Sequence, residues 1–137
     1  MWIVYALLSA LFAAFTAIFA KVGVQNINSN LATAIRTIVV LILVWAIVWF
    51  RGETKELANV SKYSLIFLIL SGLATGLSWI FYFKAIQTGN VSQVALVDKL
   101  SVVLTLILAA VFLGEPFTLK VVAAVVLIVS GVIILIW

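Results

Sequence analysis

Five apolar stretches of about 20 residues each follow one another along the chain, separated only by short polar segments. A helix needs about 20 mostly apolar residues to cross about 30 Å of hydrocarbon, so each stretch is long enough for one membrane span. The predicted helices cover residues 2–20, 31–50, 63–84, 91–113 and 118–137. The sequence therefore predicts an all-α membrane protein in which a single domain, residues 1–137, contains five transmembrane helices.

The composition excludes most other classes of protein. Hydrophobic residues make up 67% of the chain and charged residues 9%, whereas a soluble domain is about 45–50% apolar and roughly a quarter charged. We therefore expect a multi-pass protein of the cell (inner) membrane, with the lipid bilayer as its partner and no nucleic acid. Cys and His are absent, which removes the residues behind most thiolate, zinc and general-base chemistry. We expect no enzymatic activity, no metal and no cofactor.

The basic residues give only a weak signal for orientation. On the side of the N-terminus lie Arg51, Lys55, Lys62 and Lys120, and on the other side lie Lys21, Arg36, Lys84 and Lys99. When the two that fall inside predicted spans, Arg36 and Lys99, are left out, four basic residues oppose two. Basic loops favour the cytoplasmic side, and so small a bias predicts a chain that inserts in both orientations. The alternative is a fixed orientation with the N-terminus inside.

Three charged residues fall inside predicted spans. Arg36 lies in the second span, and Asp98 and Lys99 lie in the fourth. Arg36 and Asp98 are at similar depths from the same membrane face, so we expect them to pair across helices. Charges inside the membrane are costly and usually face a protein interior or an aqueous cavity, which makes them candidate functional residues. The alternatives are a purely architectural ion pair, or a Lys99 side chain that extends to the interface.

Polar side chains recur at helical spacing on three of the predicted spans. These stripes consist of Tyr5, Ser9 and Thr16; of Ser71, Thr75, Ser78 and Tyr82; and of Asn90, Asp98, Ser101 and Thr105. Three such stripes predict a hydrophilic cavity, although single Ser and Thr residues more often only join helices. Trp79 and Tyr82 are candidates to cover a substrate. The predicted substrate-binding or coupling residues are Asp98, Arg36, Lys99, Ser101, Thr105, Asn90, Ser78, Tyr82, Trp79 and Thr75.

Small residues at four-residue spacing predict close contacts between helices. Gly72 and Gly76 form a GxxxG step in the third span. Ala6, Ala10 and Ala14 form a similar ladder in the first span. We expect neighbouring helices to approach closely at both places.

The chain resembles a known family over essentially its whole length and in its helix count, and the specific motifs lie between Ala85 and Gly131. The segment GNVSQVA at residues 89–95, the segment FLGEPFT at residues 112–118 and Gly131 in the last apolar helix resemble the EamA domain of the drug/metabolite transporter superfamily. Larger members carry two such five-helix halves in inverted orientation, so one copy resembles the five-helix bacterial and archaeal branch. Larger members often have a proline near the position of Val102. Its absence here argues against a kinked fourth helix.

The resemblance implies a secondary active transporter, an exporter or exchanger of small metabolites, built from a half-transporter. A single inverted repeat forms a midplane substrate cavity by pairing with an oppositely oriented copy, which implies an antiparallel homodimer of dual topology. The last helix would form the dimer contact, with Ala123, Ala124 and Gly131 at close approach. Asp98 would be the coupling site, and the excess of cations favours a substrate with an anionic group. The alternative is an accessory subunit of fixed orientation that needs a different partner chain.

Overall fold

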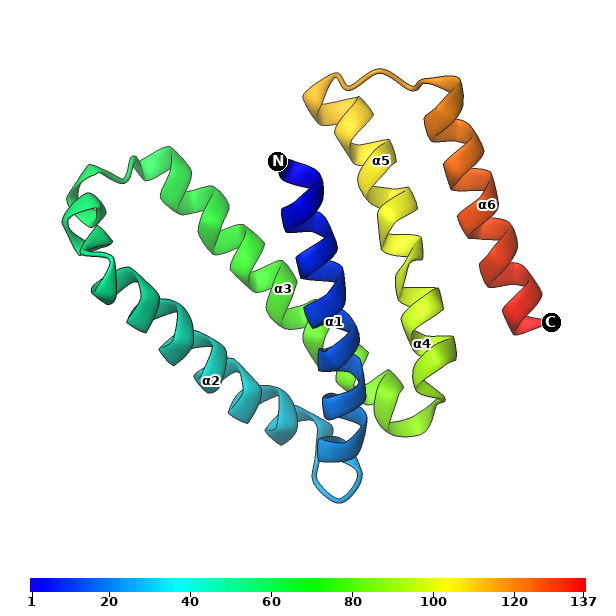
Figure 1. The fold of residues 1–137 in the computed structure, drawn as a ribbon, viewed down its shortest axis with the longest axis horizontal. Helices are drawn as coiled ribbons and strands as arrows, with labels where there is room; N and C mark the ends of the chain where they lie inside the picture. The colour runs from blue at the N-terminus through cyan, green and yellow to red at the C-terminus, as the bar shows by residue number, and fades with distance from the viewer. The chain divides into compact units, whose positions relative to one another are not determined.

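The computed structural model describes residues 1–137 and is entirely helical. In chain order the elements are α1 (Trp2–Val24), α2 (Ser29–Phe50), the 3₁₀-helix η1 (Glu53–Asn59), α3 (Lys62–Thr88), α4 (Val91–Asp98), α5 (Leu100–Leu113) and α6 (Leu119–Ile136) (Figure 1). Helices α4 and α5 together form one span, Val91–Leu113, and five spans are long and apolar enough to cross a membrane. The prediction of an all-α membrane protein with five transmembrane helices is confirmed.

The chain divides into two compact units. Unit 1, Met1–Thr88, contains α1, α2, η1 and α3, and unit 2, Gly89–Trp137, contains α4, α5 and α6. Most large apolar side chains of both units are exposed. Lipid tails are as apolar as these side chains, so membrane helices associate through close packing and hydrogen bonds more than through burial from water.

The core of unit 1 lies at one end, where the last turns of α1 and α3 meet the first turns of α2 (Figure 1). The buried side chains there are Ala17, Ala20, Val24, Ser29, Ala32, Thr33, Phe83 and Ile86. Most of them are small, which lets the helix backbones approach one another closely. The end of unit 1 at which α2 starts is therefore the tightly packed one.

Two polar side chains hold this end of unit 1 together. Lys21 Nζ donates a hydrogen bond to the Ile86 carbonyl oxygen at 2.8 Å. Gln87 Nε2 donates to the carbonyl oxygens of Val24, at 3.0 Å, and Ile27, at 2.9 Å. These bonds satisfy carbonyls near the ends of α1 and α3, where the intrahelical ladder supplies no donor. Interhelical hydrogen bonds in membranes contribute roughly 1 kcal/mol each.

The same bonds explain why two helices run further than the sequence indicated. The predicted ends at residues 20 and 84 were wrong, because α1 continues to Val24 and α3 to Thr88. The side chains of Lys21 and Gln87 both find acceptors inside the unit. Helix α2 also starts two residues earlier than predicted, since the Asn28 side chain accepts a hydrogen bond from the Asn30 N–H at 2.8 Å.

The polar segment between α2 and α3 contains a short helix that the sequence did not indicate. Gly52 has φ 69°, a left-handed conformation that favours glycine, and η1 begins directly after it. Arg51 Nε and Glu53 Oε1 form an ion pair at 2.7 Å across this turn. The segment is therefore structured rather than an open loop.

The fourth span is interrupted at Lys99, between α4 and α5. The Lys99 N–H donates to the Leu96 carbonyl at 3.1 Å, and the Val102 N–H donates to the Lys99 carbonyl at 3.0 Å. Both bonds reach back three residues, which is the pattern of a 3₁₀ turn. The span predicted over residues 91–113 is therefore one span that is interrupted at a single residue, Lys99, and the interruption arises without a proline.

In unit 2, α6 packs through Val132, which is 3% exposed. Helix α5 ends at Gly114, whose φ of 68° is left-handed, and the hydroxyl of Thr118 accepts a hydrogen bond from the Val121 N–H to start α6. Ala123, Ala124 and Gly131, the residues predicted to form a dimer contact, are all exposed within this unit. Their contact with a second chain stays a prediction.

Small residues do make the close contacts of α1, but not the ones that the sequence indicated. Ala6, Ala10 and Ala14 are exposed, whereas Ala17 and Ala20 are buried. In α3, a Cβ added at Gly72 or Gly76 would have no atom within 4 Å. Neither the alanine ladder nor the GxxxG step is a close helix contact within unit 1.

Candidate functional site

Arg36 lies inside the second span and packs on aromatic rings of α3. It is seven residues after Ser29, about 10 Å along α2 at 1.5 Å per residue. Its Cζ lies 4.1 Å from the centroid of the Trp79 ring and 5.5 Å from that of Phe83. Tyr82 is within electrostatic range of the same guanidinium. The structure therefore brings together three of the predicted site residues, Arg36, Trp79 and Tyr82.

The helical spacing of α3 accounts for this aromatic platform. Trp79 and Phe83 are four residues apart, so their side chains lie on one face of the helix, one turn apart. Phe83 is 3% exposed, so it holds this face in place from within the core. Sequence reasoning did not include Phe83 among the site residues, although its spacing from Trp79 was the signal that would have found it. A cation–π contact contributes about 0.5–1 kcal/mol at exposed sites and about 2 when desolvated.

A cavity of about 340 Å³ lies beside the guanidinium of Arg36. From α1 it is lined by Thr16, Phe19, Ala20 and Gly23, and its other lining residues are Ile27, Ala32, Ile35, Arg36 and Phe83. Arg36 is the single charged residue in this lining. The contacts that its guanidinium makes with α3 are with rings, which supply no carboxylate to its N–H groups. Chemically, the arrangement is an apolar recess with one fixed positive charge.

Thr75 and Ser78, also predicted on α3, lie apart from these contacts. Both side chains are exposed in unit 1. The Thr75 hydroxyl donates to the Ser71 carbonyl at 2.9 Å, one turn back on its own helix. A threonine bonded in this way has its donor satisfied locally. Their predicted contact with a substrate stays a prediction.

The remaining predicted residues lie along α4 and α5 in unit 2. Asp98 is the last residue of α4, Lys99 is the interruption itself, and both side chains are exposed. The Thr105 hydroxyl donates to the Ser101 carbonyl at 2.8 Å, and Asn90 Nδ2 donates to Gln93 Oε1 at 3.4 Å. The predicted stripe through these residues assumed a continuous helix. The 3₁₀ turn at Lys99 involves a single residue and shifts the rotation between α4 and α5 by only about 20°, so Asp98, Ser101 and Thr105 still lie near one face of the span.

The expected ion pair between Asp98 and Arg36 joins residues of different units. It stays a prediction. Within unit 1 the partners of the Arg36 guanidinium are aromatic, which the depth argument did not anticipate.

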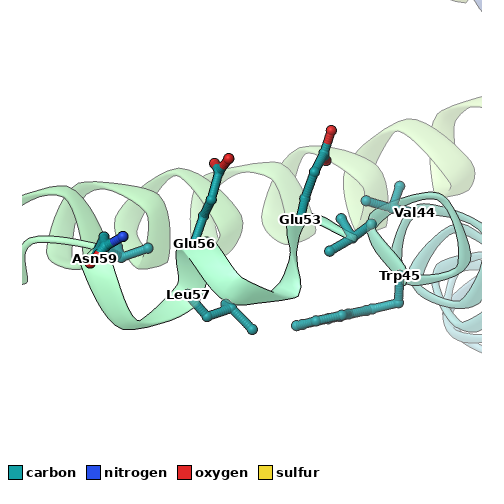
Figure 2. Close-up of a pocket in the computed structure, with 8 residues that line it drawn as sticks. Val44, Trp45, Glu53, Glu56, Leu57 and Asn59 are labelled. Atoms are coloured by element: carbon teal, nitrogen blue, oxygen red, sulfur yellow. The ribbon is translucent and has the colours of Figure 1, made fainter. Parts of the chain in front are cut away.

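A second, larger cavity, of about 780 Å³, lies between the end of α2 and η1. Figure 2 shows the carboxylates of Glu53 and Glu56 pointing to the same side, away from the Trp45 ring and Leu57. Glu53 is already paired with Arg51. This cavity lies beside the polar connection between α2 and α3 and contains no charge from inside a span. The recess beside Arg36 is therefore the stronger candidate for a substrate site.

Comparison with known proteins agrees with this membrane architecture. The EamA-like transporter family matches residues 1–137. A protein from Sinorhizobium sp, named "Uncharacterized transporter in cobO 3'region", is 47% identical over 118 residues, which cover 86% of this chain and 84% of the relative. No solved structure matches the chain. The chain has five apolar spans, a charged recess within them and a family match over its whole length. It therefore belongs to the EamA-like transporter family and is a multi-pass membrane transporter.

Proposed function

We propose that this transporter is a secondary active exporter or exchanger of small metabolites, and that its substrates carry an anionic group. The observation that carries the proposal is Arg36, held on Trp79 and Phe83 inside a span and beside a recess of about 340 Å³. A charge in this position is costly to the fold unless it faces a protein interior or an aqueous path. A positive charge at the wall of a substrate cavity is useful because it recognises anions.

The interrupted fourth span supports the coupling part of the proposal. Discontinuous helices are typical of substrate and ion sites in secondary transporters, because the broken ends expose polar groups inside the membrane. Here the interruption is at Lys99, which directly follows the acid Asp98 in the sequence. Asp98 is the only acidic residue within the five spans, which makes it our candidate for proton coupling.

We further propose that two chains work together as an antiparallel homodimer. One five-helix repeat is half of the inverted pair that encloses a midplane cavity in such transporters. The weak charge bias of the loops is compatible with insertion in both orientations. Helix α6 carries Ala123, Ala124 and Gly131 on exposed positions, where small side chains would let a second copy approach closely.

Transport by purified protein in liposomes tests the proposed function. We expect vesicles that contain the protein to accumulate organic anions from a defined mixture of carboxylates, phosphates, amines and neutral solutes, as measured by mass spectrometry against protein-free vesicles. Collapse of an imposed proton gradient with an ionophore should lower this accumulation. Uptake of amines alone would contradict the role of Arg36. Equilibration of all solutes, inorganic ions included, would indicate a channel.

Cysteine labelling tests the antiparallel arrangement, because the chain has no native cysteine. Thr54→Cys in η1 and Asn26→Cys in the α1–α2 connection lie on opposite sides of the membrane, both are exposed, and neither change alters the charge. We expect a membrane-impermeant thiol reagent to label about half of the molecules of each variant in intact cells. Labelling of one variant alone would show a fixed orientation and favour an accessory subunit that needs a different partner chain.

A further inference from the structure

The lining of the recess beside Arg36 restricts its ligand to a narrower chemical class than anions in general. Arg36 supplies the one charge, Thr16 supplies the one other polar side chain, and the rest of the lining is aliphatic, aromatic or glycine. We infer that this recess binds a monovalent organic carboxylate with an apolar body. The carboxylate lies on the guanidinium, and the body lies against Phe19, Ile35 and Phe83. This inference rests on the proposed function, which makes the recess a substrate site, but it concerns only which ligand binds there.

The charge on the ligand follows from the single guanidinium. Arginine holds a carboxylate through two parallel N–H···O bonds, and its planar group is weakly hydrated, which suits a partly desolvated site. The rings of Trp79 and Phe83 fix the position of this guanidinium before a ligand arrives, which lowers the cost of ordering it on binding. A second negative charge would enter an apolar wall without a counter-ion, which is strongly unfavourable. The recess therefore fits a monoanion better than a dianion.

The size and polarity of the recess define the body of the ligand. A cavity of about 340 Å³ is at the lower end of the range of about 300–1,000 Å³ for small-molecule sites. Thr16 alone offers a side-chain hydroxyl, so the several hydroxyl groups of a sugar would lose their water without gaining partners. The apolar walls therefore favour one ring or a branched aliphatic group over a sugar phosphate or a nucleotide.

A series of three ligands that share one ring tests the inference on the unmodified protein. Phenylacetate is a monoanion, phenylacetamide is its neutral analogue, and phenylmalonate adds a second carboxylate. In nanodiscs of zwitterionic lipid, we expect calorimetric titration to show phenylacetate binding at least about ten-fold more tightly than either of the others. Equal affinity for the amide would overturn the inference, because the charge would then not be recognised. Tighter binding of phenylmalonate would also overturn it, because the site would then accept a dianion.

A pair of leucine substitutions locates the binding. Gly23 lines the recess, and a Cβ added there has no atom within 4 Å, so Gly23→Leu adds a large side chain at the wall of the recess without a clash at its base. Ala34→Leu adds the same side chain at an exposed position of α2 outside the recess. We expect Gly23→Leu to weaken phenylacetate binding at least about ten-fold and Ala34→Leu to change it less than about two-fold. Thermal unfolding midpoints check that both variants fold, and equal binding by two folded variants would overturn the proposed location.

The membrane itself offers anions with apolar bodies, so the lipid is varied as well. We expect phenylacetate affinity to stay within about two-fold when anionic phosphatidylglycerol is added to the nanodiscs. Loss of binding there would show that a lipid headgroup occupies the recess and would overturn the inference. Titration in nanodiscs measures binding alone, because a nanodisc does not enclose a compartment into which a substrate could be transported. Phenylacetate binding without transport would therefore contradict the proposed function alone, whereas transport of other anions without phenylacetate binding would contradict this inference alone.

Discussion

Arg36→Gln is expected to lower the rate of anion uptake into proteoliposomes by about 30-fold to several thousand-fold at low substrate concentration. Loss of one partner from a desolvated, hydrogen-bonded charge pair costs about 2–5 kcal/mol, and each 1.4 kcal/mol is a factor of ten in affinity. Glutamine keeps a polar amide on a shorter side chain but has no positive charge to attract the anionic substrate. The measurement is the initial rate of uptake of the anion identified from the solute mixture, with equal amounts of protein in each vesicle preparation.

Two further arginine variants make this result specific. Arg36→Lys keeps the charge but loses the planar group that stacks on Trp79, so we expect an intermediate rate. Arg51→Gln is the matched control, because Arg51 is exposed at the other end of α2 and pairs with Glu53. Its rate should stay within about two-fold of the unmodified protein, as is usual for an exposed ion pair. Equal losses in Arg36→Gln and Arg51→Gln would show that the Arg36 recess is not a substrate site.

Asp98→Asn is expected to remove the response of uptake to a proton gradient. Asparagine has nearly the same shape as aspartate but cannot bind and release a proton at neutral pH. We therefore expect the ratio of uptake with a gradient to uptake without one to fall to about one, while exchange of labelled for unlabelled substrate continues. Asp98→Glu, which keeps a carboxyl group, should retain part of the response.

Glu115→Gln is the control for this experiment. Glu115 lies in the α5–α6 connection, outside the helices that form the spans, so the same loss of a carboxylate there should leave the gradient response unchanged. A full gradient response in Asp98→Asn would exclude Asp98 as the coupling group. The unmodified protein could also show no gradient response at all. In that case Asp98 does not couple transport to protons, and transport is uniport or exchange.

The number of spans could be predicted from the sequence because one large effect determines it. Each stretch of about 20 apolar side chains gains enough on transfer to lipid to outweigh a single charge such as Arg36. The ends of the helices depend on smaller effects. Lys21 and Gln87 bond to carbonyl groups more than 60 residues away in sequence, and local pattern contains no information about such partners.

Sequence reasoning named Arg36, Trp79 and Tyr82 as candidates but did not predict the contacts that Arg36 makes. Depth along a helix follows from residue number, and it placed Arg36 and Asp98 at the same level of the membrane. Depth leaves the rotation of each helix about its axis undetermined, and rotation decides which neighbour a side chain meets. Arg36 meets Trp79 and Phe83, and Phe83 was not expected at the site. The interruption at Lys99 was missed because no glycine or proline marks it in the sequence.

The bonds from Lys21 and Gln87 have a mechanical consequence for unit 1. They fasten α1, the α1–α2 connection and α3 at one end, whereas no comparable bond joins the far ends of α1 and α3. A tilt of α1 relative to α3 would therefore pivot about the end that these bonds join. At 1.5 Å per residue α1 is about 35 Å long, so a tilt of about 10° moves its free end by about 6 Å. The same tilt displaces residues near the joint, such as Thr16 and Gly23, far less. Such a tilt would therefore displace the walls of the recess less than it displaces the opposite end of the unit.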